Sequence, residues 1–278
     1  MKVLISIDME GVAGVATLDQ IYRGGSGYPR AMELMTEEAN AAIVGAFAGG
    51  ATEVVVDDSH GTMDNLLHAR LDPRARVTFG TPRAQCMVQG VDAETDVVLF
   101  VGYHAPAGCH GVLAHTYAGF TSVRINGVEQ SEASANAIIC AAHGVPVGMV
   151  TGDDVICAQA RELFPSAEVV EVKQADGFAA ATSVHPEVAQ DLIRAAAERA
   201  VRDAAQLPRP EAPAYLVLEL DFPTPLHADF VALCPGFERV SGMTVRASFS
   251  DAQELAPAIS AAFYLMSIAA GQFAAGRR

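Results

Sequence analysis

Two hydrophobic patterns alternate along the first two thirds of the chain. Short runs rich in β-branched residues are typical of buried strands, and the longer segments between them repeat apolar positions at helical spacing. The strand-like runs are residues 2–7, 53–57, 75–79, 96–103, 122–125, 146–151 and 168–173, and helices are expected over residues 28–49 and 131–143. This alternation predicts an α/β fold with a helix-flanked, mostly parallel sheet.

The pattern changes after about residue 174. The last third predicts a long Ala-rich helix over residues 185–205, followed by a Pro-rich connector over residues 208–213. Two strands are expected at residues 215–221 and 245–249, a short helix at residues 229–233 and a C-terminal helix over residues 251–273. We therefore expect two domains. Residues 1–178 would form an α/β domain that carries the candidate chemistry, and residues 179–278 a smaller α+β domain.

Polar side chains follow three of the predicted strands. Asp8 and Glu10 come directly after the strand of residues 2–7, His60 follows that of residues 53–57, and His104 follows that of residues 96–103. In extended backbone, residues i and i+2 point to the same side, so the two carboxylates project together. Gly11 then allows a sharp turn. Ligands bind at this end of the strands in open α/β sheets, and neighbouring strands would bring all four side chains to one edge.

The residue types at this edge suit a divalent metal. Neighbouring carboxylates such as Asp8 and Glu10 repel each other unless they share a proton or a cation neutralises them. Two histidines with two or more carboxylates suit zinc or a similar ion. A simpler interpretation stays open, in which these are solvated loop, capping or ordinary polar residues. Glu132 is a further candidate ligand, although the helix dipole alone favours a carboxylate in a first turn, and spacing favours that interpretation.

His115 lies apart from the strand ends, between Ala114 and Thr116. It is compatible with a general acid or base and equally with a hydrogen-bonded core histidine. The pair Asp57 and Asp58 would cap the turn that follows it or hold a metal-bound His60 in place.

Composition narrows the classes of function. The 278 residues are 51% hydrophobic and carry a formal net charge of −15, which argues against nucleic acid as a partner. The five cysteines are scattered without a CxxC pair, which argues against a disulfide framework and a thiolate zinc cluster. The sequence has no bilayer-length apolar run and no secretory leader pattern, so we expect a cytoplasmic protein without membrane attachment.

Several short motifs occur in an order that resembles a known family. They are Ser6-Ile-Asp-Met-Glu-Gly11, Met35-Thr-Glu-Glu-Ala-Asn40, Asp57-Asp-Ser-His60, Gly102-Tyr-His-Ala105, Ala114-His115, Ile125-Asn126, Glu132 with Asn136, Gly152-Asp-Asp154 and Val172-Lys-Gln174. Together they cover most of the chain. The chain thereby resembles the zinc-dependent D-aminopeptidases of the dipeptide-transport, or DppA-like, type.

The resemblance implies an activity and a ligand set. It implies hydrolysis of the N-terminal D-amino acid from short peptides such as D-Ala-D-Ala, at a site with two Zn²⁺ ions per subunit. It further implies that Asp8 bridges the two metals. Glu10 and His60 would complete one metal site, and His104 and Glu132 the other.

The resemblance also implies a catalytic residue and an assembly. His115 would be catalytic, as the nucleophile described for the family, and the subunits would form a ring-like homodecamer with an enclosed chamber. The sequence departs from the family at Ser131, at Ala133-Ser134 and in the loop of residues 17–27, which concerns substrate preference more than metal binding. The residues alone leave two alternatives, a two-metal hydrolase of another amide or a phosphoester and a non-catalytic, metal-stabilised binding protein.

Overall fold

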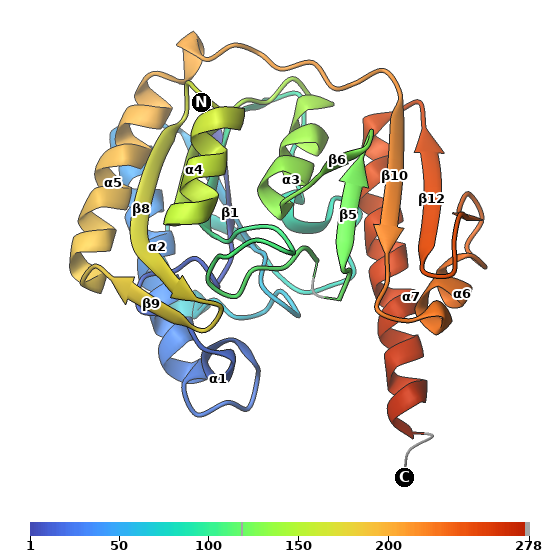
Figure 1. The fold of residues 1–278 in the computed structure, drawn as a ribbon. Coiled ribbons are helices and arrows are strands. Elements are labelled where there is room, and N and C mark those ends of the chain that lie inside the picture. Colours follow the sequence, from blue (N-terminus) through green and yellow to red (C-terminus); the bar gives the residue numbers. More distant parts are fainter. Residues whose placement is uncertain (118, 276–278) are drawn as a thin grey trace.

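Two β-sheets with helices on their faces make up the structure, a computed structural model that describes residues 1–117 and 119–275 (Figure 1). In the first sheet, β1 (Lys2–Ile7) pairs in parallel with β2 (Glu53–Asp58) on one side and β4 (Thr95–Tyr103) on the other. The remaining strands are β3 (Arg76–Thr78) beside β2, and β7 (Val147–Asp153), β8 (Glu168–Gly177) and β9 (Ala180–Ser183) beyond β4. Only the β8–β9 pairing of this sheet is antiparallel in the described ranges, so the predicted mostly parallel sheet is confirmed.

Helices cover both faces of this sheet. They are α2 (Tyr28–Ala48) and α5 (Pro186–Arg202) on one face, and α3 (Glu132–Ala141) and α4 (Asp154–Leu163) on the other. The alternation of β1 divides its side chains between two cores, because Val3 and Ile5 pack with α2 and α5 whereas Leu4 packs toward α3. A strand covered in this way is apolar on both sides, which explains the continuous apolar run of β1.

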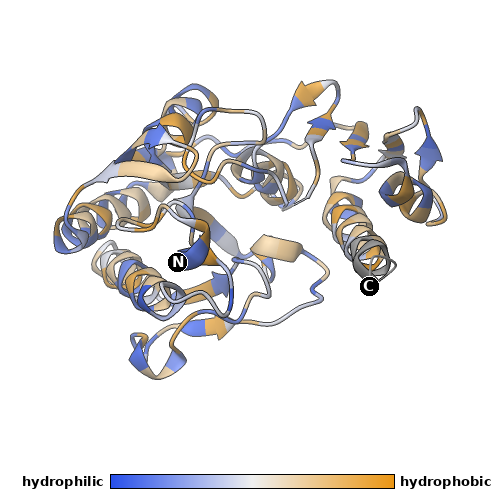
Figure 2. Ribbon diagram, turned by 60° about the horizontal axis from the view of Figure 1, so that its bottom comes forward, coloured by the Kyte–Doolittle hydropathy of each residue, from blue (hydrophilic) through white to orange (hydrophobic). Residues whose placement is uncertain are grey.

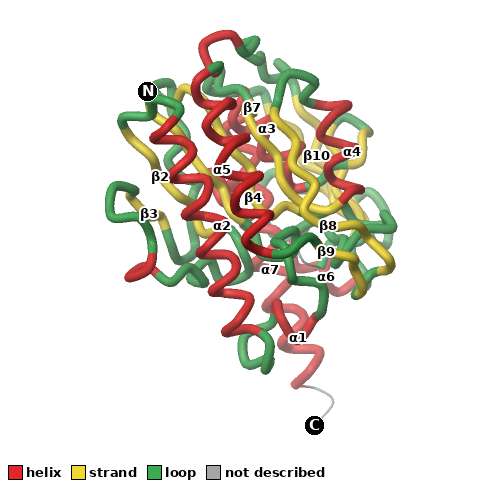
Figure 3. The backbone as a smooth tube through the Cα atoms, turned by 90° about the vertical axis from the view of Figure 1, so that its left-hand side faces the viewer, coloured by secondary structure: helices red, strands yellow, loops and turns green. Residues whose placement is uncertain are grey.

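The long Ala-rich helix α5 is amphipathic and packs its apolar face against α2 and the sheet. Figure 3 shows α2 and α5 lying side by side, and Figure 2 shows hydrophobic and hydrophilic residues alternating along the helical ribbons. In α5, small buried residues such as Ala189, Ala196 and Ala197 permit a close approach to α2. Pro186 occupies the first turn of α5, where its missing N–H is not needed.

The second sheet is antiparallel and lies beside the first, with α7 packed along it (Figure 1). Its order is β11-β12-β10-β5-β6, formed by β5 (Ser122–Ile125), β6 (Val128–Glu129), β10 (Leu216–Asp221), β11 (Glu238–Arg239) and β12 (Thr244–Phe249). Two helices accompany it, α6 (Pro225–Val231) and α7 (Leu255–Ala275). The α+β character expected for the C-terminal part is found here.

The two sheets do not separate at residue 178. β5 and β6 come earlier in the chain yet pair into the second sheet through β10, whereas β9 and α5 come later yet complete the first sheet and its cover. The division into residues 1–178 and 179–278 stays a prediction about domains. Long-range pairing of β5 with β10 could not be inferred from local patterns, which report strands but not their partners.

Smaller elements differ from the prediction. The short α1 (Leu18–Ile21) and the strand β9 were not predicted, and α6 begins at Pro225 rather than at residue 229 because proline favours the first helical turn. Turns of 3₁₀ helix lie at His68–Arg70, Cys86–Val88, Ala204–Gln206 and Ala252–Glu254. Among the described residues, no helix has both the length and the apolar character needed to cross a membrane.

Candidate metal centre

The ends of β2, β1 and β4 meet at one edge of the first sheet, because these strands are neighbours and parallel. The segment after β1 lies directly against the end of β4, where the Asp8 N–H donates to Val101 (2.9 Å) and the Gly11 N–H donates to Gly102 (2.7 Å). Gly102 has a φ of +66°, and a Cβ there would lie 2.3 Å from the Asp8 carbonyl oxygen. Glycine at this position therefore allows the two strand ends to touch.

His60 faces two carboxylates on the β1–β2 side. Its Nδ1 lies 2.9 Å from Glu10 Oε2 and 3.3 Å from Asp8 Oδ1. Its Nε2 lies 2.8 Å from the carbonyl oxygen of Ile21, at the end of α1. All three ionisable side chains are buried, so the loop that contains α1 covers this side of the edge and also fixes the imidazole ring.

His104 occupies the β4 side and connects Asp8 to the helix α3. Its Nε2 lies 3.3 Å from Asp8 Oδ2 and 3.4 Å from Glu132 Oε2, while its Nδ1 lies 3.0 Å from the carbonyl oxygen of Ala105. Glu132 stands in the first turn of α3, whose N-terminus Ser131 caps. Asp8 is thus central, with one carboxylate oxygen toward each histidine.

His115 is the accessible member of the group. Its ring stacks on that of His104, with 4.1 Å between centroids and an interplanar angle of 15°. Its Nε2 lies 3.7 Å from Glu132 Oε1, and its Nδ1 lies 2.8 Å from the carbonyl oxygen of Leu113. The His115 side chain is 26% exposed, whereas that of His104 is 1% exposed. A substrate could therefore reach His115 from solvent.

The three histidines share one hydrogen-bonding arrangement, in which one ring nitrogen faces a backbone carbonyl and the other faces carboxylates. A carbonyl only accepts, so a neutral ring places its N–H there and turns its lone pair toward the carboxylates. In histidine metal ligands, the second ring N–H commonly donates to a carbonyl or carboxylate. His104 Nε2 is buried and has no hydrogen-bond partner within the described parts of the chain. A cation among these atoms would satisfy it, and the mixed nitrogen and oxygen donors fit zinc.

The electrostatics of the cluster favour positive charge. Burial raises the pKa of Asp8, and the Glu10 carboxylate raises it further. Burial disfavours the charged forms of His60 and His104, but the carboxylates around them, Glu10 with Asp8 and Glu132 with Asp8, together outweigh it and hold both histidine pKa values well above the usual range. The field that favours a proton on these rings also favours a metal cation in its place.

The chain matches known proteins over nearly its full length. The family model described as D-aminopeptidase matches residues 1–261. The chain belongs to this D-aminopeptidase family. A D-aminopeptidase of Bacillus subtilis (strain 168) is 35% identical over 245 residues, which cover 88% of this chain and 89% of that protein. The earlier resemblance and the predicted enzyme class, an aminopeptidase that acts by hydrolysis, are thereby confirmed.

A solved structure shares the fold of this D-aminopeptidase chain. It is the Zn-dependent D-aminopeptidase DppA from Bacillus subtilis, a self-compartmentalizing protease, with a TM-score of 0.92 and 33% sequence identity. The match covers 96% of this chain and 98% of that chain. It confirms the predicted α/β class, with a mostly parallel sheet and an additional antiparallel sheet.

Asp57 and Asp58, which precede His60 in the chain, contact the nearby backbone and Arg83. Asp58 accepts hydrogen bonds from the backbone N–H groups of Asn65 (2.5 Å) and Leu66 (2.7 Å), so it stabilises the turn after His60. Asp57 is buried near Arg83, with 3.8 Å between charged atoms. The sequence suggested two roles for this pair, capping of the following turn or support of the His60 ring. The structure shows that Asp58 caps the turn. His60 Nε2, the ring nitrogen that faces away from the carboxylates, contacts the Ile21 carbonyl and neither aspartate.

Lys173 appeared in the sequence only as part of the motif Val172-Lys-Gln174, with no role assigned, and it is buried beside the centre. Its Nζ donates to the carbonyl oxygens of Glu10, Val12 (3.0 Å) and Val15 (2.5 Å), and so holds the loop that follows β1. The sequence signal was a charged residue at the end of an apolar strand. Glu38 supports the same loop by accepting the N–H of Ala13 at 2.8 Å.

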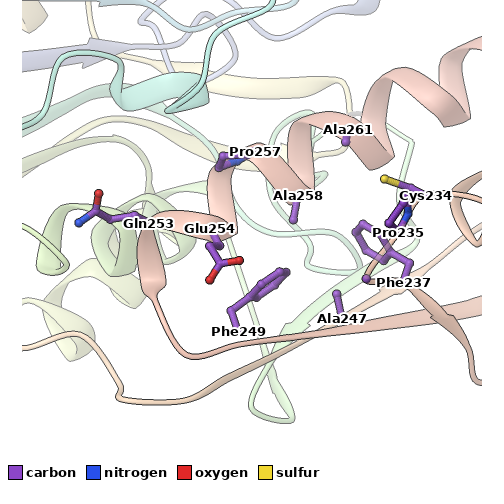
Figure 4. A pocket seen from close by; sticks show the side chains of 11 residues that line it. Cys234, Pro235, Phe237, Ala247, Phe249, Gln253, Glu254, Pro257, Ala258 and Ala261 are labelled. Atoms are coloured by element: carbon purple, nitrogen blue, oxygen red, sulfur yellow. The ribbon is translucent and has the colours of Figure 1, made fainter.

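A separate pocket lies away from this cluster, between β12, α7 and the segment before β11 (Figure 4). Its volume is about 390 Å³, and its lining is mainly apolar, as at Phe237, Phe249 and Pro257. None of its lining residues belongs to the histidine and carboxylate cluster. Ionisable groups converge at the sheet edge and not at this pocket, so the edge is the candidate site for chemistry.

Proposed function

We propose that this protein is a zinc-dependent aminopeptidase that removes the N-terminal D-amino acid from short peptides such as D-Ala-D-Ala. It would use two Zn²⁺ ions per subunit, held by Asp8, Glu10, His60, His104 and Glu132. The observation that carries the proposal is the common orientation of the histidines, whose carbonyl-bound nitrogens leave the other nitrogens facing carboxylates. The Zn dependence of the Bacillus subtilis structure supports the choice of metal.

The position of Asp8 supports its assignment as the ligand shared by two metals. Its Oδ1 faces His60 and its Oδ2 faces His104, so each oxygen belongs to a different half of the cluster. Glu10 would then complete the His60 half and Glu132 the His104 half. Zinc, when bound, supplies Lewis-acid polarisation of the scissile carbonyl and activation of water.

His115 is proposed to carry the proton during hydrolysis, rather than to act as the nucleophile that the family resemblance implies. With the Nδ1 proton donated to Leu113, its Nε2 is free to take a proton from the attacking water and return it to the leaving amine. Glu132 lies 3.7 Å from this nitrogen and would stabilise the protonated ring. The partial exposure of His115 and its stacking on His104 place the imidazole where substrate can meet the metal ligands.

A homodecamer with an enclosed chamber and a cytoplasmic location belong to the same proposal. The support for the enclosed assembly is the likeness to a solved D-aminopeptidase that is described as self-compartmentalizing. Sedimentation velocity of the full chain tests the assembly, with a ring-sized particle as the expected result. A stable monomer at micromolar concentration would contradict it.

Substrate preference is tested with D-Ala-D-Ala, D-Ala-Gly and L-Ala-L-Ala. We expect cleavage of the two D-peptides, loss of that cleavage after chelation and its recovery with Zn²⁺. Faster cleavage of L-Ala-L-Ala would contradict the D-specific proposal. Activity that survives complete removal of metal would contradict the zinc-dependent one.

A further inference from the structure

A connected set of buried polar side chains lies directly beneath the candidate metal centre. Its members are Ser6, Ser59, Tyr103, Tyr117 and Asn136, all of them buried. Each lies within four residues, along the sequence, of a different candidate site residue. In the same order, these site residues are Asp8, His60, His104, His115 and Glu132. The set therefore has a member on each segment that carries a candidate site residue.

The hydrogen bonds of this set connect through Tyr103. Its hydroxyl oxygen lies 2.7 Å from Ser6 Oγ and accepts a hydrogen bond from Asn136 Nδ2 at 3.1 Å. Asn136 Oδ1 accepts from the hydroxyl of Tyr117 at 3.2 Å, and Ser6 Oγ donates to the carbonyl of Met87 at 2.7 Å. The bonds can thus run in one direction, from Tyr117 through Asn136 and Tyr103 to Ser6 and Met87, with each hydroxyl donating once.

The bond between Asn136 and Tyr103 joins helix α3 to the sheet below the centre. Tyr103 on β4 and Ser6 on β1 are held in register by the strand pairing, so their positions do not depend on α3. Glu132 lies one helical turn before Asn136, and it is the candidate ligand that comes from a helix. The place of Glu132 relative to Asp8 thus depends on how α3 is attached to the sheet.

We infer that Tyr103 is a positioning residue, which sets Glu132 against His104 and Asp8 through its bond to Asn136. The inference rests on the proposed two-zinc centre and predicts an asymmetry within it. The pair Glu10 and His60 is carried by the segments after β1 and β2, and the His60 ring contacts Glu10, Asp8 and the Ile21 carbonyl rather than residues of α3. Loss of the Tyr103 hydroxyl would therefore loosen the zinc held by His104 and Glu132 and leave the other close to wild type.

The test compares zinc affinities of the full chain by competition with a chelator, in wild type and in Tyr103→Phe. Substitution of a residue that orients metal ligands lowers the metal affinity by about 10–100-fold, and we expect a loss of that size for one of the two zinc ions. Thr95→Val is the matched control. It removes a buried hydroxyl from the opposite end of β4, where Thr95 contacts Asp92 at 3.1 Å, and should leave both affinities unchanged.

The outcomes separate this inference from the proposed function. Two zinc ions in wild type with unchanged affinities in Tyr103→Phe would overturn the inference and leave the proposed function standing. Equal weakening of both zinc ions would overturn the asymmetry, and hence the inference. A single zinc in the wild-type chain would overturn the two-zinc proposal together with the inference built on it.

A second variant tests the same bond from its other end. Asn136→Leu keeps a side chain of similar size and removes the donor to Tyr103, so it should weaken the same zinc. If both residues act through one bond, the double variant loses less affinity than the product of the two single losses. Losses that multiply would show that the residues act independently and would overturn the inference.

Discussion

The two halves of the candidate metal centre differ in how the chain builds them. The half with Glu10 and His60 comes from the ends of adjacent parallel strands and is buried beneath the loop that contains α1. The half with His104 and Glu132 combines the end of β4 with the first turn of helix α3, and it meets solvent at the neighbouring His115. The local sequence pattern predicts the half that is built from strand ends well, whereas the half that includes helix α3 depends on contacts between segments far apart in the chain.

Removal of Asp8 should have the largest effect, because this residue contacts both halves. We expect Asp8→Ala to bind one zinc or none and to lose about 1,000-fold in turnover of D-Ala-D-Ala, the size of loss seen when an essential electrostatic group is removed. Elemental analysis and steady-state kinetics measure both effects. Two zinc ions retained in Asp8→Ala would show that the halves are independent of the shared carboxylate.

Removal of the exposed histidine should separate chemistry from metal binding. His115→Ala leaves the five proposed ligands in place, so it should keep its zinc and lose about 100–10,000-fold in kcat, the range for a general acid or base. Kinetics and metal content of the same sample are compared. Near-normal turnover in this variant would remove His115 from the mechanism.

Removal of the buried Lys173 ammonium should destabilise the loop after β1, and with it the half of the centre that contains Glu10 and His60. Lys173→Met leaves three backbone carbonyls without their donor, and we expect a loss of about 3–5 kcal/mol in the free energy of unfolding. Lys2→Met is the matched control. Its ion pair with Asp92 lies nearer the surface, and its loss should cost below about 1 kcal/mol in urea unfolding. Equal losses in the two variants would contradict a special contribution from Lys173.

The stability of the protein should depend on pH through Glu38, which accepts a hydrogen bond from the loop after β1. Burial raises the pKa of Glu38 to about 7, against a usual value of 4.5. The folded state therefore binds more protons between these values, and the stabilisation present below pH 4.5 is lost as the pH rises through about 7.

Replacement of Glu38 tests this dependence. Glu38→Gln cannot titrate, so between pH 5 and pH 8 it should lose about 1–3 kcal/mol less stability than wild type. Urea unfolding at the two pH values, in the same buffer system, measures the difference. Identical pH dependence in both proteins would show that Glu38 does not carry the effect.

The sequence predicted the strand-end residues for a physical reason. Parallel strands present their carboxyl ends at one edge, so Asp8, His60 and His104 could be placed together from apolar runs alone. Glu132 and His115 were candidates among the residues, but their roles as metal ligand and catalytic residue rested on the family resemblance. Spacing favoured a first-turn carboxylate at a helix N-terminus for Glu132, but its side chain accepts the Tyr117 N–H, from outside the helix, at 2.6 Å and faces His104.

The remaining features depend on contacts that no local pattern reports. The segment before His115 is fixed by Asp153, which accepts the Val112 N–H, and by Phe178, which accepts the Leu113 N–H, each at 2.7 Å. Those partners lie tens of residues away in the chain. The same applies to Lys173, whose three acceptors follow the first strand, and to the second sheet, which combines strands from both halves of the sequence.

The most direct test of the central claim is anomalous diffraction at the zinc edge from crystals of the zinc-loaded protein. The account predicts two zinc peaks, one beside Glu10 and His60 and one beside His104 and Glu132, with Asp8 between them. A single peak, or zinc bound elsewhere on the chain, would contradict a two-metal centre joined by Asp8.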